Sequence, residues 1–192
     1  MLIDAERSLL LVVDLQAKMV PALADGDAIV ANAVWLIRVA QRIGVPVAAV
    51  EQYPKGLGPL VPAIRDLLAP EAVATKRRFS CVAAKCLAGL PGTDRAQVVI
   101  AGAETHVCVL QSALELVRPG GTVLAFGGLA RESRVEVDPF RIHYEEVTLK
   151  GAFHHTPRHV RAALAFLGSG AYPFERLITH QLGLEGVAAL LA

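Results

Sequence analysis

The chain has 192 residues, of which 54% are hydrophobic and 19% charged, and its formal net charge is +1. This balance is typical of a folded domain with a sizeable core and argues against intrinsic disorder. Because no basic block stands out, nucleic acid is not an expected partner. No apolar run approaches the roughly 20 residues of a membrane span, so no membrane partner is expected either.

The cysteines and the first residues suggest where the protein works. Cys81, Cys86 and Cys108 are an odd set without metal-like spacing, which is typical of reduced thiols in a cytoplasm rather than of a disulfide framework. The first residues also lack the basic and apolar regions of a signal peptide. We therefore expect a cytoplasmic protein, with Cys81 and Cys86 as packing residues on a short helix.

The first half of the chain predicts a βαβ unit. Residues 8–14 form a continuous apolar run ending in Asp14, which predicts a strand buried on both faces. Residues 28–43 have apolar positions at helical spacing, which predicts a helix. Residues 45–50 predict the next strand, and the Pro- and Gly-rich residues 51–62 predict a loop. Asp14 then lies at the carboxyl edge of the sheet, where α/β folds bind ligands. Alternatively, Asp14 only orders the following loop.

A second polar residue falls on the same edge. After a short helix near residues 62–68, residues 72–76 predict a strand that ends in Lys76. Taken alone, the run Lys76-Arg77-Arg78 is more typical of a solvated face than of a functional site.

The third polar residue lies in QVVIAGAETHVCVLQSALELV, residues 97–117. A short apolar run, a polar turn and apolar residues at helical spacing predict strand, turn and helix. Cys108 then lies in the first helical turn, where free amides and the helix dipole would lower the pKa of its thiol. The alternative is a buried cysteine that only packs.

Asp14, Lys76 and Cys108 are thus expected at the ends of three parallel strands, with groups that suffice for nucleophilic acyl chemistry. The stretches LLLVVDLQ, VEQYPKGLGP, ATKRRFSC and VVIAGAETHVCVLQSALEL occur in that order. Over about residues 6–117, the chain therefore resembles the isochorismatase-like cysteine hydrolases. The resemblance implies that Cys108 is the nucleophile, Asp14 the general base and Lys76 its charge partner.

The resemblance has two further implications. It implies a cis peptide bond between Ala103 and Glu104, with the backbone amides of Glu104 and Cys108 forming an oxyanion hole. In nicotinamidases, which belong to the same superfamily, histidines hold a metal, and the loop that corresponds to theirs is EQYPKGLG here. Because this loop has no histidine, we expect no metal and no cofactor, and we do not expect nicotinamide as the substrate.

The C-terminal part, about residues 114–192, resembles instead the C-terminal portion of medium-chain zinc-type alcohol dehydrogenases, through RPGGTVLAFGG, EVTLKGAFHH and LITHQLGLE. The Gly-rich dinucleotide turn and the zinc ligands of that family are missing upstream. His154, His155 and His159 suggest a metal tract, but metal binding needs three or four convergent ligands, and we expect none here.

We therefore expect one domain over residues 1–192, with a dehydrogenase-like segment at 118–192. Its fold is a three-layer αβα arrangement around a mostly parallel sheet of Rossmann-type order. Strands at 122–126 and 146–153 and a helix at 156–167 would complete that sheet. Weak packing is expected at 129–143, and the tail from Ala171 would lie over the surface.

The expected function is hydrolysis of a small amide, imide or ester through a Cys-Asp-Lys triad and an acyl-enzyme. The chain could also form a homo-oligomer. Two alternatives stay open, namely an NAD-dependent dehydrogenase fragment and a catalytically inactive hybrid scaffold.

Overall fold

The structure is a computed structural model that describes residues 3–126, 134, 136–152, 156–170, 175, 178, 180–187 and 189. The chain divides into two compact units, residues 1–153 and 154–192. The single domain expected over residues 1–192 stays a prediction. Within the described residues, no helix is long and apolar enough to cross a membrane.

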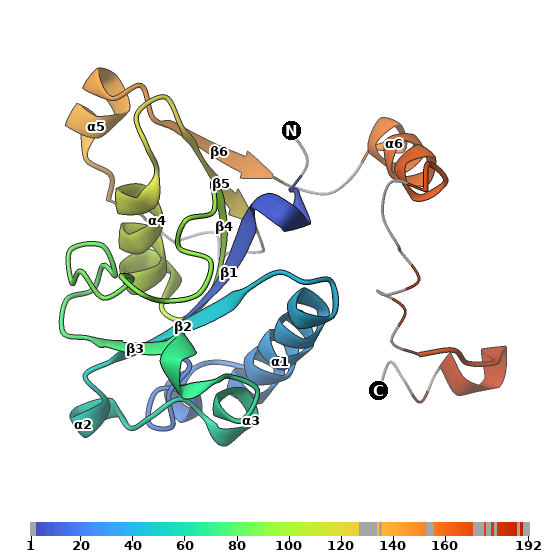
Figure 1. The fold of residues 1–192 in the computed structure, drawn as a ribbon, viewed down its shortest axis with the longest axis horizontal. Coiled ribbons are helices and arrows are strands. Elements are labelled where there is room, and N and C mark those ends of the chain that lie inside the picture. Colours follow the sequence, from blue (N-terminus) through green and yellow to red (C-terminus); the bar gives the residue numbers. More distant parts are fainter. Residues whose placement is uncertain are drawn as a thin grey trace. The chain divides into compact units, whose positions relative to one another are not determined.

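The first unit is built on a four-stranded parallel sheet in the order β3-β2-β1-β4 (Figure 1). Its strands are β1 (Ser8–Val13), β2 (Val47–Gln52), β3 (Val73–Lys76) and β4 (Gln97–Gly102). All six residues of β1 are buried, as an unbroken apolar run predicts for a central strand. The predicted α/β fold with a mostly parallel sheet is confirmed.

Helices cover both faces of this sheet (Figure 1). On one face lie α1 (Gly26–Arg42) and α3 (Pro62–Arg65), and their shared core includes Leu10, Val12, Ala33, Ile37 and Ile64. On the other face lies α4 (Leu110–Leu116), and the core there includes Leu9, Leu11, Val13, Cys81 and Cys108. Successive β1 side chains point to opposite faces, so this one strand contributes to both cores.

Short elements connect these layers. Three 3-10 turns lie at Ala5–Arg7, Val20–Ala22 and Pro70–Ala72, and the predicted loop 51–62 contains the short helix α2 (Pro54–Leu57). A π-helical turn, Thr105–Val109, joins β4 to α4.

The segment from Cys81 to Cys86 forms turns rather than the predicted helix. Its interruption has a visible cause, because Lys85 has a left-handed backbone with φ of 53°. Such a conformation does not continue a right-handed helix.

Strands β5 (Thr122–Phe126) and β6 (Thr148–Ala152) pair in parallel with each other and form a separate two-stranded sheet. The expectation that they complete the main sheet is wrong for the described part of the chain. Leu124 is 53% exposed and Phe126 88% exposed. A short apolar run such as residues 123–126 predicts a strand, but it does not determine which strand edge that strand joins.

The connection between these two strands contains a helix, α5 (Pro139–Tyr144), that the hydrophobic pattern did not predict. Asp138 caps it, since its carboxylate accepts a hydrogen bond from the Phe140 amide at 2.9 Å. An acidic cap followed by proline was the available signal. Much of the expected weak segment, residues 129–133 and 135, lies outside the described residues.

The second unit contains α6 (Pro157–Leu167), close to the predicted helix 156–167. Thr156 and His159 cap its start reciprocally, each accepting a hydrogen bond from the other's backbone amide. Val160, Leu164 and Leu167 on this helix are exposed. A 3-10 turn follows at Leu184–Gly186. Half of the tail expected to lie over the surface, from Ala171 on, falls outside the described residues.

Candidate active site

The Asp14 carboxylate lies at the carboxyl end of β1 and is completely buried. Its amide donates to Val50 O at 3.1 Å, which ties the end of β1 to β2. Its backbone is left-handed, with φ of 56°, a conformation that costs free energy in a non-glycine residue and often occurs at functional sites. The Oδ1 atom is buried without a hydrogen-bond partner among the described residues.

Lys76 ends β3 and is also buried. Its ammonium group donates to Asp14 Oδ2 at 2.6 Å and to Gln52 Oε1 at 2.9 Å. A buried charge needs such partners, because transfer of an unpaired charge out of water is costly. The structure therefore joins two of the three predicted site residues in one ion pair.

Sequence reasoning missed the glutamines that support this pair. Gln52 ends β2, and its backbone amide donates to Gln16 Oε1 at 2.7 Å, while Gln16 Nε2 donates back to Gln52 O at 3.0 Å. Gln16 is completely buried. The signal was present, because Gln52 is the last residue of β2 and Gln16 comes three residues after the end of β1, at the sheet edge where the predicted site was already placed. These bonds hold the ends of β1 and β2 in register beside the ion pair.

Gly102 brings β4 against this end of β1. Its φ is +147°, and an added Cβ would lie 2.0 Å from Val13 O. No side chain can therefore be accommodated there. Ala103 N donates to Val13 O at 2.9 Å, and the following peptide bond, between Ala103 and Glu104, is cis.

Cys108 lies in the π-helical turn after this bond and is only 4% exposed. Burial raises the pKa of its thiol to about 12, and the Asp14 carboxylate adds to the rise, while Lys76 opposes it. The expectation of a lowered thiol pKa is therefore wrong. Desolvation and the neighbouring anion disfavour the thiolate more than the helix start and Lys76 favour it.

The pKa of Asp14 is also raised above its usual value, chiefly by burial. Hydrogen bonding to Lys76 and then to Cys108 opposes this rise. The resting site thus holds a protonated thiol beside a carboxylate that Lys76 keeps paired. This combination can transfer a proton from sulfur to the carboxylate as the sulfur attacks an electrophile.

The other two cysteines lie near α4 but form a distinct pair. Cys81 is fully buried, its amide donates to Ser112 Oγ at 3.1 Å, and the Ser112 hydroxyl donates to Cys81 Sγ at 3.3 Å. Cys86 is half-buried, and hydrogen bonding with Cys81 lowers the pKa of its thiol. Cys86 is therefore the thiol that would compete with Cys108 in a labelling experiment.

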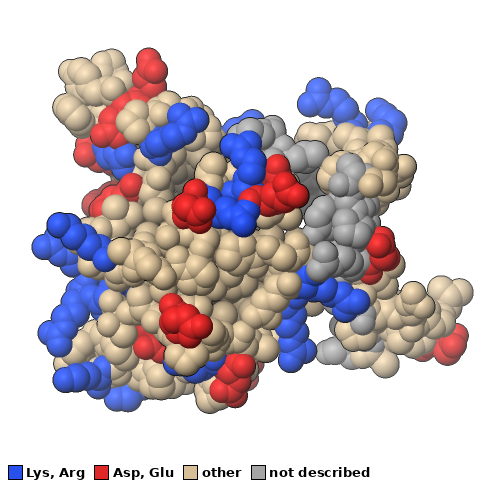
Figure 2. Space-filling view, in the orientation of Figure 1, with Lys and Arg blue, Asp and Glu red and all other residues tan. Residues whose placement is uncertain are grey.

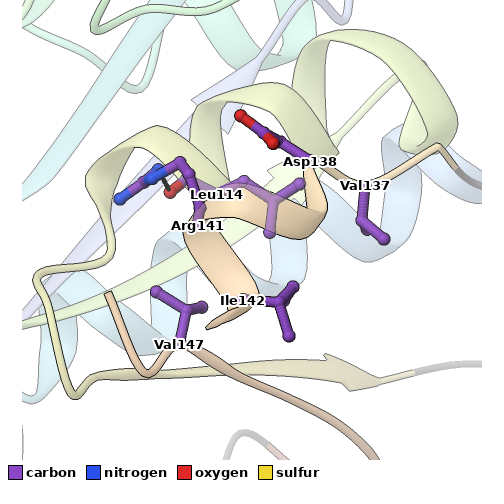
Figure 3. A pocket seen from close by; sticks show the side chains of 6 residues that line it. All are labelled: Leu114, Val137, Asp138, Arg141, Ile142 and Val147. Atoms are coloured by element: carbon purple, nitrogen blue, oxygen red, sulfur yellow. Dashed lines mark hydrogen bonds between the residues drawn. The ribbon is translucent and has the colours of Figure 1, made fainter. Parts of the chain in front are cut away.

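A small apolar cavity lies apart from these residues (Figure 3). Its volume is about 30 Å³, and its lining includes Leu114, Val137, Arg141, Ile142 and Val147. Arg141 projects from α5 and donates to Leu114 O and to Val117 O, the latter at 3.0 Å, which satisfies carbonyls at the end of α4. The cavity is far too small for a substrate.

Within the described part of the chain, no three His, Cys, Asp or Glu side chains gather as a metal site. His154 and His155 lie outside the described residues, and the His159 ring caps α6.

Comparison with known proteins identifies relatives. The Isochorismatase domain family matches residues 8–126. Isochorismatase domain-containing protein 1 of Salmo salar is 41% identical over 110 residues, which are 56% of this chain and 38% of that protein. The chain thus spans about two fifths of the length of this curated relative.

Isochorismatase domain-containing protein 2 of Xenopus laevis is 32% identical over 170 residues, covering 86% of this chain and 78% of that protein. Similarity to this family therefore extends into the C-terminal half. Nothing in these comparisons supports the dehydrogenase resemblance of residues 114–192. Among solved structures, MAR1 ribonuclease from Caenorhabditis elegans matches with a TM-score of 0.57 and 26% identity over 96% of each chain.

Proposed function

Because the chain belongs to the isochorismatase family, we propose that it is a cysteine hydrolase of a small amide, imide or ester. The observation that carries the proposal is the buried Lys76–Asp14 ion pair beside the Cys108 thiol. Structural ion pairs can also be buried, but this one has a carboxylate oxygen with no hydrogen-bond partner among the described residues and a nucleophile within its electrostatic reach. Such a cluster favours a catalytic role.

In the proposed mechanism, the Asp14 carboxylate takes the thiol proton while Cys108 Sγ attacks the substrate carbonyl carbon. Because the pKa of the thiol is raised, deprotonation accompanies attack rather than preceding it. The backbone amides of Glu104 and Cys108 hold the negative charge that develops on the carbonyl oxygen. Lys76 keeps the carboxylate oriented and disfavours its protonation at rest.

The tetrahedral adduct then expels the amine or alcohol, which takes the proton from Asp14 and leaves a thioester on Cys108. Asp14 next accepts a proton from water as the water oxygen attacks the thioester carbonyl. As this second adduct collapses and releases the carboxylic acid, the Cys108 sulfur takes the proton back from Asp14, which restores the thiol and the carboxylate. Each proton transfer thus uses the same carboxylate, which requires that Asp14 be ionised when the substrate binds.

The experiment is turnover of p-nitrophenyl acetate, an activated ester, with intact-mass detection of the acyl-enzyme. We expect one acetyl group on Cys108, and we expect Cys108→Ala to abolish turnover while the folded state persists by circular dichroism. Cys86→Ser is the matched control, because it removes the competing thiol outside the ion pair. An undiminished rate in Cys108→Ala would overturn the proposal, and an inert wild type would favour a catalytically inactive scaffold.

The remaining sequence expectations stay proposals. They are a small-molecule substrate with no nucleic-acid or membrane partner, a homo-oligomer and a cytoplasmic location.

A further inference from the structure

A loop around α2 connects the structural elements that hold the ion pair. On one side, Lys18 N donates to Leu57 O at 3.1 Å, close after Asp14 in the chain. On the other side, Tyr53 N donates to Lys76 O at 2.9 Å. Residues 53–58 therefore border the Asp14–Lys76 pair, and side chains that project from this loop or contact it lie at the edge of the candidate site.

Four exposed cations gather on this loop and on the chain beside it, namely Lys18, Lys55, Arg77 and Arg78, which we call the cationic rim. Lys18 Nζ donates to Gly56 O at 3.1 Å, and the Arg77 guanidinium lies 5.2 Å from the centre of the Tyr53 ring. Figure 2 shows Lys and Arg gathered along the edge of the first unit where α2 and the end of β3 lie in Figure 1.

These charges have no carboxylate partner within the described residues, where the ion pairs are Lys76–Asp14 and Arg141–Glu145. Lys76 neutralises the Asp14 carboxylate, so this buried ion pair adds no net negative charge that would offset the positive charge of the rim. Glu51 is buried and accepts from Leu60 N.

Exposed acids at this end of the unit lie on other elements. Asp25 and Asp27 are at the start of α1, and Glu104 follows β4, which is the strand farthest from β3 in the sheet. The acid that lies nearest to Arg78 along these contacts is Glu115 on α4, whose Oε2 accepts from Ser80 Oγ at 2.8 Å. The edge of the site formed by β2, β3 and α2 is therefore positive. Exposed charges of one sign at the mouth of a site raise the local concentration of ligands of the opposite sign.

Resting on the proposed hydrolase function, we propose that this site selects small substrates that carry a carboxylate, which the cationic rim attracts while the scissile carbonyl faces Cys108. The positive charges of the rim lie on one side of the sheet edge, so they orient a carboxylate substrate as well as raise its local concentration. Because the rim is exposed, its attraction weakens as salt is added.

The test compares two alkylating reagents of nearly the same size, anionic iodoacetate and neutral iodoacetamide, with each cysteine followed by peptide mass spectrometry. In both reactions the thiolate sulfur displaces iodide, so the reagents differ mainly in charge. The rate ratio of iodoacetate to iodoacetamide at Cys108 is divided by the same ratio for glutathione. We expect this normalised ratio to be about tenfold at low ionic strength and to fall toward one at high salt.

The variant that tests the source of this selectivity is Lys55→Gln/Arg77→Gln/Arg78→Gln. We expect it to lose most of the iodoacetate preference while its iodoacetamide rate changes much less. Arg38→Gln, an exposed arginine on α1, is the matched control and should keep the preference. An unchanged ratio in the triple variant would overturn the rim proposal while leaving the hydrolase proposal intact. Failure of both reagents to modify Cys108, with Cys86 modified, would overturn both.

Protection of Cys108 distinguishes the kind of anion. We expect succinate to slow iodoacetamide labelling of Cys108 more than its neutral diamide does, and the triple variant to lose the difference. Protection by a short single-stranded RNA but not by succinate would overturn the proposal and assign the rim to nucleic acid.

Discussion

Two ion pairs of equal length lie in two different regions of this protein. Lys76–Asp14 joins strands of the main sheet at 2.6 Å with both side chains fully buried. Arg141–Glu145 spans one turn of α5, also at 2.6 Å, with side chains 25% and 31% exposed. The distance is the same, but water screens only the second pair. Burial, rather than the distance between the charged atoms, therefore decides which pair has the larger effect on the protonation of its side chains and on the free energy of unfolding.

The same contrast extends to apolar residues. Leu11 of β1 is completely buried, whereas Leu124 of β5 is 53% exposed, although both lie in parallel strands. β1 has a strand on each side and helices over both faces, but β5 pairs only with β6 among the described residues. Strand formation and core formation are therefore separate outcomes of one hydrophobic pattern.

The largest expected effect tests the chemistry of the buried region. Asp14→Asn removes the proposed base, so we expect turnover of p-nitrophenyl acetate to fall about 10²–10⁴-fold. The same change removes an anion that raises the pKa of Cys108 and leaves Lys76 to lower it, so alkylation of Cys108 near neutral pH should become faster. Opposite changes in the two rates, measured on one preparation, are the signature. Parallel losses would contradict the proposed role of Asp14.

The next effect compares the two ion pairs directly. Lys76→Met leaves a buried carboxylate without its partner, and we expect the free energy of unfolding to fall by about 3–5 kcal/mol. Glu145→Gln breaks the half-exposed pair and should cost less than about 1 kcal/mol. Urea denaturation of both variants measures the difference. Equal losses would show that burial does not separate the pairs.

The smallest effect compares the two leucines. Leu11→Ala removes a completely buried side chain and should cost about 2–5 kcal/mol. Leu124→Ala truncates an exposed side chain and should cost under about 1 kcal/mol. The measurement is again chemical denaturation. A large loss at Leu124 would mean that this face of β5 is covered in solution, for instance by a second copy of the chain.

Sequence reasoning was strongest where one hydrophobic pattern indicates both the type of element and its burial. The run at Ser8–Val13 predicted a central parallel strand, and the structure places it there with every residue buried. The resemblance over residues 6–117 is supported by the match of the Isochorismatase domain family to residues 8–126. The roles of Asp14, Lys76 and Cys108 stay predictions. Gln16 and Gln52 were missed although they lie at or near strand ends, because a glutamine there matches no catalytic motif.

Hydrophobic spacing acts locally, so it was enough to predict β1, β2, β3, β4 and α1, although it failed for α5 and for the turns at 81–85. The sequence by itself also placed Asp14, Lys76 and Cys108 at element ends, since parallel strands bring their carboxyl ends to one edge. The pairing of β5 with β6 apart from the main sheet is a tertiary outcome, because strand pairing depends on which sheet edges meet in the folded chain. The tertiary structure likewise decided the direction of the Cys108 pKa shift, because desolvation and neighbouring charge come from residues distant along the chain.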